Sequence, residues 1–297
     1  MEAKVILITG ASSGFGRITA EMLAETGHII YASMRAIDSK NTDRAEEMQQ
    51  QASEKGRQLF PIELDVTSEE SAKSAAAKII EEQGRIDVVI NNVGMLVVGV
   101  TEAFTPEQML QVFNTNAVSW LIIGRAFLPY MRQQEDGLML YVGSVTSRIL
   151  SPFQGPYVAS KAAGDVLAEV MHYENTRYGI DTVIVQPGAY TSGTSHFAHA
   201  VQARDERVTA QYDRINDLPP KLAERLDDLI EPGVRSDIAE VAEKIRDAIA
   251  LPKGKRPFRI VVDPEHHGAT EINEVAEKMQ RNFMKRFGIE DLMQVNQ

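Results

Sequence analysis

Cysteine is missing from the 297-residue chain. Its absence excludes disulfide bonds, thiolate nucleophiles and metal sites built from cysteine. A chain without cysteine fits a reducing compartment, and no signal-peptide architecture precedes the apolar run at residues 5–8. We therefore expect a cytoplasmic protein.

Long apolar runs and positive charge are also scarce. No run approaches the roughly 20 residues of a membrane-spanning helix, so no membrane span is predicted. The formal net charge is −11, which argues against non-specific binding of nucleic acid or of anionic membranes. The remaining composition, 43% hydrophobic and 25% charged, is that of an ordinary globular protein, and the length fits one α/β domain over residues 1–297.

Short apolar runs alternate with helical segments along most of the chain. Runs without polar alternation, such as residues 5–8, are typical of strands buried on both faces. Strands are predicted at residues 5–8, 29–33, 58–64, 86–90, 138–142, 181–185 and 258–262. Because helical segments separate these strands, we expect an α/β fold of the Rossmann type, a doubly wound parallel sheet of about seven strands with helices on both faces.

A glycine-rich turn follows the first predicted strand, in the segment TGASSGFG at residues 9–16. Gly10 permits a tight turn, Gly14 lets a phosphate approach backbone amides, and Gly16 lets helix and strand pack closely. A strand, such a turn and a helix together form a phosphate cradle. A flexible turn is the alternative interpretation, but the flanking strand and helix favour the phosphate cradle.

Arg35 follows the second predicted strand, where dinucleotide-binding folds usually have an acidic residue that holds the ribose. A guanidinium suits the additional 2′-phosphate of NADP. A solvated surface arginine is the alternative, and Asp38 is the competing acidic candidate farther along the loop. We favour the phosphate interpretation and expect NADP(H) as the cofactor.

Tyr157 and Lys161 are four residues apart in the segment YVASK, at the predicted start of a helix. This spacing places them on one helical face. A nearby ammonium and the helix dipole both favour a phenolate, so together they could lower the pKa of Tyr157 enough for acid–base catalysis. The motif also occurs by accident on amphipathic helices, so its weight depends on the rest of the sequence.

Seven motifs together carry a resemblance to a known family. They are TGASSGFG at 9–16, Asp65, NNVG at 91–94, Asn116, Ser144, YVASK at 157–161 and PGAYT at 187–191. In this order and spacing the chain resembles the short-chain dehydrogenase/reductase family, in its compact single-domain branch. It is most similar there to hydroxysteroid-dehydrogenase-like and retinol-dehydrogenase-like enzymes. The resemblance covers residues 4–192 and the predicted helix and strand at 237–262.

Two departures from the family pattern are mild. NNVG replaces the commoner NNAG, and Gly143 precedes Ser144 where a second serine is commoner. Neither change removes a functional group.

The resemblance implies a catalytic role for four residues. Tyr157 would exchange the hydroxyl proton, and Ser144 would hold the substrate oxygen. Lys161 would lower the pKa of the tyrosine and bind the nicotinamide ribose, and Asn116 would hold a water that links Lys161 to solvent. The expected cofactor contacts are Gly10, Ser12, Ser13, Gly14, Phe15, Gly16, Arg35, Asp65, Val66, Asn92, Gly94, Tyr157, Lys161, Pro187, Gly188 and Thr191. The expected substrate contacts are Met95, Ser144, Val145, Ile149, Phe153, Gln154, Tyr157 and Tyr190. No metal is expected.

Residues 192–236 form a long connection after the sixth predicted strand. Compact domains seldom carry such stretches without a functional reason, so we expect a substrate lid with short amphipathic helices. His196 and His199 are interpreted as surface or pocket-lining residues, because a metal site would need a third ligand.

The C-terminal extension, residues 264–297, contains a predicted amphipathic helix near residues 271–286. Its apolar stripe consists of Ile272, Val275, Met279 and Phe283. Packing of this stripe on the protein's own core is the default expectation. Contact with a neighbouring subunit and closure over the pocket are the alternatives.

The resemblance implies an enzyme, an NADP(H)-dependent oxidoreductase that interconverts a secondary alcohol and a ketone, or a primary alcohol and an aldehyde. The expected pocket is mainly apolar, which favours a bulky hydrophobic substrate. The alternatives are a dinucleotide-binding redox sensor without turnover and another reaction on the same fold, such as 3-oxoacyl reduction or epimerisation. Because the family is usually dimeric or tetrameric, a homodimer or homotetramer is expected.

Overall fold

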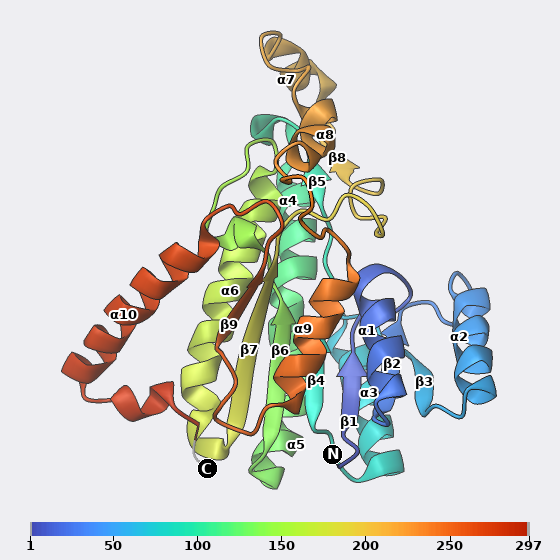
Figure 1. Cartoon of the computed structure of the whole chain (residues 1–297). Helices are drawn as coiled ribbons and strands as arrows, with labels where there is room; N and C mark the ends of the chain where they lie inside the picture. The colour runs from blue at the N-terminus through green and yellow to red at the C-terminus, as the bar shows by residue number, and fades with distance from the viewer. Residues whose placement is uncertain (1, 296–297) are drawn as a thin grey trace.

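The computed structural model describes residues 2–295, which form a parallel sheet between two layers of helices (Figure 1). The strands of this sheet are β1 (Val5–Ile8), β2 (Ile29–Met34), β3 (Leu59–Glu63), β4 (Val88–Asn91), β6 (Gly137–Val142), β7 (Ile180–Pro187) and β9 (Arg259–Val262). Their order across the sheet is β3-β2-β1-β4-β6-β7-β9. All neighbouring strands run parallel. The predicted Rossmann-type fold is confirmed.

Each face of the sheet has its own apolar layer. Ile6 and Ile8 of β1 belong to the layer under α1, α2 and α9, whereas Val5 and Leu7 belong to the layer under α3, α5 and α6. These helices are α1 (Gly14–Glu25), α2 (Thr42–Glu54), α9 (Ala239–Ala250), α3 (Glu69–Gln83), α5 (Ser119–Gln134) and α6 (Gly155–Asn175). Because helices cover both faces, all four side chains of β1 are buried, as the unbroken apolar run indicates. No helix within residues 2–295 is long and apolar enough to cross a membrane.

The winding direction of the chain reverses between β1 and β4. β1 pairs with β2 on one side and with β4 on the other, so the chain builds outward in both directions from this point. The carboxyl ends of the parallel strands share one edge, and ligands of such sheets bind where the winding reverses. The turn after β1 and the end of β4 are joined there, because Thr9 N donates to Ile90 O at 2.9 Å.

Residues 192–236 rise above this edge of the sheet (Figure 1). β8 (Val201–Gln202) pairs in parallel with β5 (Val97–Val98), and two short helices follow, α7 (Glu206–Gln211) and α8 (Leu222–Asp227). Leu222 is buried against the apolar cluster that contains Tyr157. The segment therefore stands over the carboxyl ends of the strands, where a lid was predicted.

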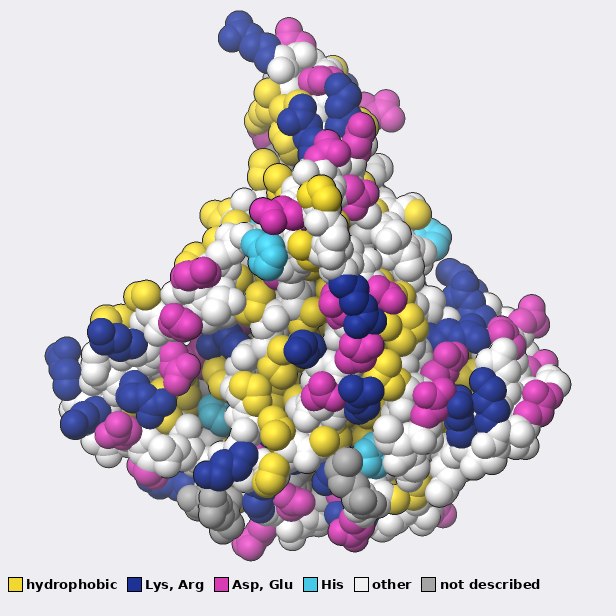
Figure 2. Space-filling model, viewed as in Figure 1, with side chains coloured by type: hydrophobic (Ala, Val, Ile, Leu, Met, Phe, Trp, Pro, Cys, Tyr) yellow, Lys and Arg dark blue, Asp and Glu magenta, His cyan; other side chains and the backbone are white. Residues whose placement is uncertain are grey.

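The C-terminal helix α10 (Ala269–Phe287) lies outside β9, and Lys and Arg side chains gather over it (Figures 1 and 2). The expectation that its apolar stripe packs on the core is wrong. Val275 and Met279, for example, are 61% and 53% exposed. Asn273 and Met284 are buried instead. On the inward side Asn273 forms hydrogen bonds with Gln186 and Arg148.

Candidate active site

A cavity of about 1170 Å³ opens at the carboxyl ends of the strands, beneath residues 192–236. Of the residues predicted to contact cofactor or substrate, most line it: Gly10, Ser12, Ser13, Gly14, Phe15, Arg35, Asp65, Val66, Asn92, Gly94, Met95, Ser144, Val145, Ile149, Gln154, Tyr157, Lys161, Pro187, Gly188 and Tyr190. Four predicted site residues do not contribute to the lining: Gly16, Asn116, Phe153 and Thr191. The sequence motifs thus converge on one cavity.

The turn after β1 has the geometry of a phosphate cradle. Gly10 and Gly14 have φ values of +68° and +56°, in the left-handed region that favours glycine. A Cβ on Gly16 would lie 2.4 Å from Gly10 O, so only glycine allows α1 to pack this closely on the turn. Asn92 fixes the turn from the side, because its Nδ2 donates to Thr9 O at 2.9 Å and to Gly10 O at 3.2 Å.

Basic side chains lie at the end of the cavity beyond β2. Arg35 lines it together with Lys40 and Arg44, and all three are exposed. The Glu63 carboxylate shapes the turn that presents Arg35, because it accepts hydrogen bonds from Ala36 N at 3.0 Å and Ile37 N at 2.7 Å. The competing candidate Asp38 does not line the cavity. This end can therefore attract a phosphate.

Ser144, Tyr157 and Lys161 meet at the opposite end of the cavity. Tyr157 and Lys161 lie one turn apart in the first part of α6, near the start of the helix as predicted. The three side chains are buried, with exposures of 6, 8 and 4% in the order given. Ser144 Oγ accepts hydrogen bonds from Thr146 N at 3.1 Å and Thr146 Oγ1 at 2.9 Å. Lys161 Nζ donates to Val142 O at 2.9 Å and lies 5.9 Å from the centre of the Tyr157 ring.

Burial shifts the pKa values of the two titratable groups at this end. It raises the pKa of Tyr157 to about 12, although a hydrogen bond with Ser144 acts in the opposite direction. It lowers the pKa of Lys161 to about 8. The predicted lowering of the tyrosine pKa is not found, because the lost solvation of the phenolate outweighs the hydrogen bond with Ser144. At neutral pH the phenol is protonated and the ammonium is largely charged.

Asn116 lies beside this group without reaching the cavity. It belongs to a π-helical turn, Asn114–Val118, that joins α4 (Pro106–Phe113) to α5. Such turns often mark functional sites. The buried carboxamide donates to Met95 O at 3.0 Å and to Ser160 Oγ at 2.9 Å, and accepts from Met95 N at 2.8 Å. Asn116 therefore ties the segment after β4 to the helix that carries Tyr157.

The sequence profile of the short chain dehydrogenase family matches residues 4–204. This chain belongs to that family. The resemblance seen in the sequence motifs is therefore confirmed.

Several relatives share the family assignment. The 3-ketodihydrosphingosine reductase of Bacteroides thetaiotaomicron is 38% identical over 193 residues, a region that covers 65% of this chain and 66% of that protein. The chain therefore matches slightly less than two thirds of that relative's length. The uncharacterised oxidoreductase YusZ of Bacillus subtilis is 30% identical over 222 residues, covering 72% of this chain and 76% of that protein.

Solved structures of short-chain dehydrogenases have the same fold. One from Streptomyces avermitilis has a TM-score of 0.74 and 26% identity, covering 97% of this chain and 98% of that chain. An alcohol dehydrogenase from the archaeon Thermococcus sibiricus, complexed with 5-hydroxy-NADP, has a TM-score of 0.69 and 26% identity, covering 89% of this chain and 97% of that chain. The likeness extends over the C-terminal region that the family profile does not reach.

This short-chain dehydrogenase also has two basic cavity residues that sequence reasoning missed. Lys40 and Arg44 line the cavity together with Arg35. Only their basic character just after the second strand could have indicated this position. His196, expected at the surface or in the pocket, lines the cavity with its ring 6.1 Å from that of Tyr157. Burial, and secondarily Lys161, lowers the pKa of His196 to about 4, so this histidine is neutral at physiological pH. No motif marks His196, because its position depends on how residues 192–236 fold over the site.

A second missed group lies beside Gly188, one of the expected cofactor contacts. Asp263, Glu265 and His267 present ligand atoms within 4.8 Å of one another, the one such group found within the described residues 2–295. His267 Nδ1 lies 2.8 Å from Asp263 Oδ1, and Glu265 Oε2 accepts from Ala189 N at 3.2 Å. Burial and the neighbouring Asp263 raise the pKa of Glu265 to about 7. These contacts fasten the segment after β7 to the segment after β9.

Proposed function

We propose that this short-chain dehydrogenase is an NADP(H)-dependent oxidoreductase that interconverts a bulky secondary alcohol and the corresponding ketone. The observation that carries the proposal is the cavity itself. A phenol, a hydroxyl and an ammonium converge at its buried end, and three basic side chains line its exposed end. A cradle of positive-φ glycines lies between them.

The buried end supplies the proton chemistry of carbonyl reduction. When bound, a reduced nicotinamide supplies the hydride. Ser144 Oγ and the Tyr157 hydroxyl donate hydrogen bonds to the substrate oxygen, and the protonated phenol then gives its proton to that oxygen as negative charge develops. Lys161 stabilises the phenolate that remains, because its ammonium lies over the same ring. With the pKa of Tyr157 at about 12, the phenol that donates the proton is protonated at neutral pH.

Apolar side chains support a bulky hydrophobic substrate. Those near the buried end come from the segments after β4 and β6 and from the lid: Met95, Leu96, Val145, Ile149, Leu150, Phe197, Leu222, Leu226 and Leu229. A pocket of this kind binds by apolar burial, with few polar groups to fix orientation. The name of the Bacteroides relative, a 3-ketodihydrosphingosine reductase, also favours a keto group as the reacting group.

The exposed end supports NADP(H) over NAD(H). Arg35, Lys40 and Arg44 can surround a 2′-phosphate, whereas the carboxylate of Asp38 stays outside the cavity. The solved alcohol dehydrogenase with 5-hydroxy-NADP is in line with this preference.

The test is an NADPH-oxidation screen across steroids, aryl ketones, retinoids and short aldehydes, with NADH in parallel. We expect turnover of a bulky ketone with NADPH. Binding of NADPH without turnover of any carbonyl would favour a redox sensor, and activity confined to 3-oxoacyl thioesters would assign the alternative reaction.

A further inference from the structure

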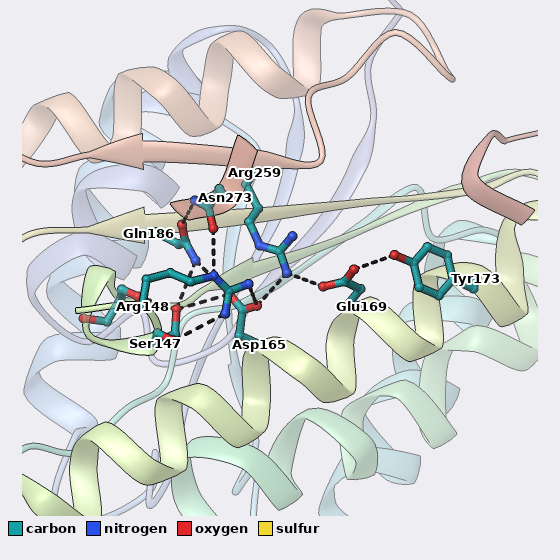
Figure 3. Close-up of polar contacts among 9 residues, drawn as sticks. Ser147, Arg148, Asp165, Glu169, Tyr173, Gln186, Arg259 and Asn273 are labelled. Atoms are coloured by element: carbon teal, nitrogen blue, oxygen red, sulfur yellow. Dashed lines mark hydrogen bonds and ion pairs between the residues drawn. The ribbon is translucent and has the colours of Figure 1, made fainter. Parts of the chain in front are cut away.

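A buried polar cluster lies among β7, β9, α6 and α10 (Figure 3). Its centre is the fully buried carboxylate of Asp165. Oδ1 accepts from Arg148 Nη2 at 2.8 Å and from Arg259 Nη2 at 2.6 Å, and Oδ2 accepts from Gln186 Nε2 at 2.8 Å. Asp165 thus accepts hydrogen bonds from three segments that are far apart in the sequence.

Asn273 of α10 closes this cluster from outside. Its Nδ2 donates to Gln186 Oε1 at 2.7 Å, and its Oδ1 accepts from Arg148 Nε at 2.8 Å. The orientation of both amides is determined, because Asp165 only accepts and Arg148 only donates. Gln186 must turn its nitrogen to Asp165 and its oxygen to Asn273.

The cluster holds the segment that carries Ser144. Ser147 Oγ donates to Ser144 O at 2.9 Å and accepts from Gln186 Nε2 at 3.0 Å. Arg148 belongs to the same turn, because its amide donates to Val145 O at 2.9 Å. The position of Ser144 is therefore linked by two adjacent residues to Gln186 and Asn273.

The same cluster holds the two other segments of the buried end. Asp165 lies one turn beyond Lys161 and two beyond Tyr157 on α6, and these positions share a helical face. Gln186 directly precedes Pro187 and Gly188, which line the cavity. The segment of Ser144 and the end of β7 are thus joined to Asp165 by hydrogen bonds, and α6 connects Asp165 to Tyr157 and Lys161.

We infer that Asn273 is a positioning residue for the reaction and that α10 is an integral part of the active site. The inference rests on the proposed function, because it assumes that Ser144 acts on the substrate. Loss of Asn273 leaves Gln186 Oε1 and Arg148 Nε buried without their partners, and such groups move to find new ones. Movement of Arg148 displaces the turn that ends at Ser147, and Ser144 moves with it.

Asn273→Leu tests this inference, since leucine has the same branched side-chain outline as asparagine and forms neither hydrogen bond. Displacement of a catalytic group by about 1 Å can cost roughly 100-fold in rate, so we expect kcat to fall about ten- to hundredfold. The Kd of NADPH, measured by its fluorescence, should change less than about threefold, because the phosphate cradle is remote. Asn282→Leu is the matched control, because Asn282 is exposed on the same helix. It should leave kcat unchanged.

A double-mutant cycle separates positioning from general damage. If Asn273 acts through Ser144, Asn273→Leu should cost little further kcat in a Ser144→Ala background. Asn273→Asp should recover part of the lost activity, because it keeps the acceptor for Arg148. Equal losses in both backgrounds, or kcat within twofold of wild type in folded Asn273→Leu, would overturn the inference. If Asn273→Leu fails to fold, the cycle with Asn273→Asp decides in the same way.

Amide hydrogen exchange gives a readout that does not depend on turnover. Residues 145–149 should exchange faster in Asn273→Leu than in Asn282→Leu. Unchanged exchange there would refute the positioning role even in an active enzyme. If no carbonyl is reduced but exchange rises, the proposed function fails while the link from α10 to the Ser144 segment stands.

Discussion

At one end of the cavity Ser144, Tyr157 and Lys161 are buried, and at the other end Arg35, Lys40 and Arg44 face solvent. Burial shifts the pKa of Tyr157 upward and that of Lys161 downward, whereas the basic end is open to water and salt. Electrostatic interactions are strong where water is excluded and weak where it is not. A single side chain at the buried end should therefore contribute more to activity than a single side chain at the exposed end.

The first prediction concerns the buried end, where the largest effect is expected. Tyr157→Phe keeps the ring and removes the proposed proton donor. General acid–base catalysis contributes about 10²–10⁴-fold, so kcat should fall at least that far. The Kd of NADPH, measured by fluorescence titration, should stay nearly unchanged.

Tyr178→Phe is the control for this prediction, because Tyr178 is a half-exposed tyrosine outside the cavity. It should retain wild-type kcat. If Tyr157→Phe also keeps most of its activity, the proton donor is a different group and the buried end is misassigned.

The second prediction concerns the exposed end, where the effect should be smaller and sensitive to salt. The wild-type enzyme should prefer NADPH over NADH by at least about tenfold in kcat/KM, since hydrogen bonds to charged groups contribute roughly 1.5–3 kcal/mol. Arg35→Ala should remove most of this preference, chiefly through the KM of NADPH. The preference should also decrease as ionic strength rises, because exposed charge contacts are screened.

Arg286→Ala on α10 is the matched control, because Arg286 is exposed and remote from the cavity. Equal use of NADH and NADPH by the wild-type enzyme would mean that Arg35 is a surface residue and that Asp38 is again the candidate ribose ligand.

The two ends also differ in how far the sequence revealed them. Tyr157, Lys161 and Ser144 follow from spacing and motif, because their helix and strand are regular elements whose geometry is fixed by local sequence. The basic end was found only through Arg35, which directly follows a strand. Lys40 and Arg44 lie beyond an irregular turn whose shape depends on Glu63 of β3, a contact between residues far apart in the sequence.

Irregular segments account for the other differences as well. His196 reaches Tyr157 only because β8 pairs with β5 and brings residues 192–236 over the site. The periodicity of α10 correctly indicates a helix, but it gives the wrong buried face. An amphipathic pattern predicts that the apolar side of a helix is buried. Here the buried side of α10 instead carries Asn273, which forms two hydrogen bonds with the rest of the protein. A hydrogen-bond network across four elements leaves no local signal in the sequence.

The third prediction concerns residues 192–236, the segment predicted to be a lid over the buried end. Residues 195–230 should be cleaved several-fold more slowly by a protease when NADPH and a ketone substrate are bound than in the free enzyme. Lids belong to the less stable parts of a fold, and a ligand beneath them adds contacts. Limited proteolysis with mass spectrometry measures the rate, and cleavage elsewhere serves as the internal reference. Equal cleavage in both states would show that this segment is a fixed wall of the cavity.

The smallest expected effect is a change of stability with pH, and it concerns the end of β7. Two polar clusters contact this end of the strand. Gln186 is held by Asp165 and its two arginines, and arginine keeps its charge throughout the physiological range. Ala189 is held by Glu265, whose pKa is raised to about 7 by burial and by Asp263. The second cluster therefore contains a group whose pKa is near neutral pH.

A carboxyl group with a raised pKa stabilises the fold in its protonated form. The contribution of Glu265 is complete below its ordinary pKa of 4.5 and is lost as pH rises through about 7. His267, whose pKa its hydrogen bond with Asp263 raises, also contributes stability that is lost as pH rises through its folded value. Both groups therefore predict that the free energy of unfolding decreases between about pH 5 and pH 8, by on the order of 1 kcal/mol.

Glu265→Gln tests this last expectation, because a glutamine can still accept from Ala189 N but does not titrate. Urea unfolding of the variant should show a flatter dependence on pH than the wild type between pH 5 and pH 7, with the two curves closest at the acidic end. Glu271→Gln, an exposed carboxyl on α10, should follow the wild-type curve. If the Glu265→Gln and wild-type curves run parallel, Glu265 is ionised throughout, and both clusters hold β7 by permanent charge.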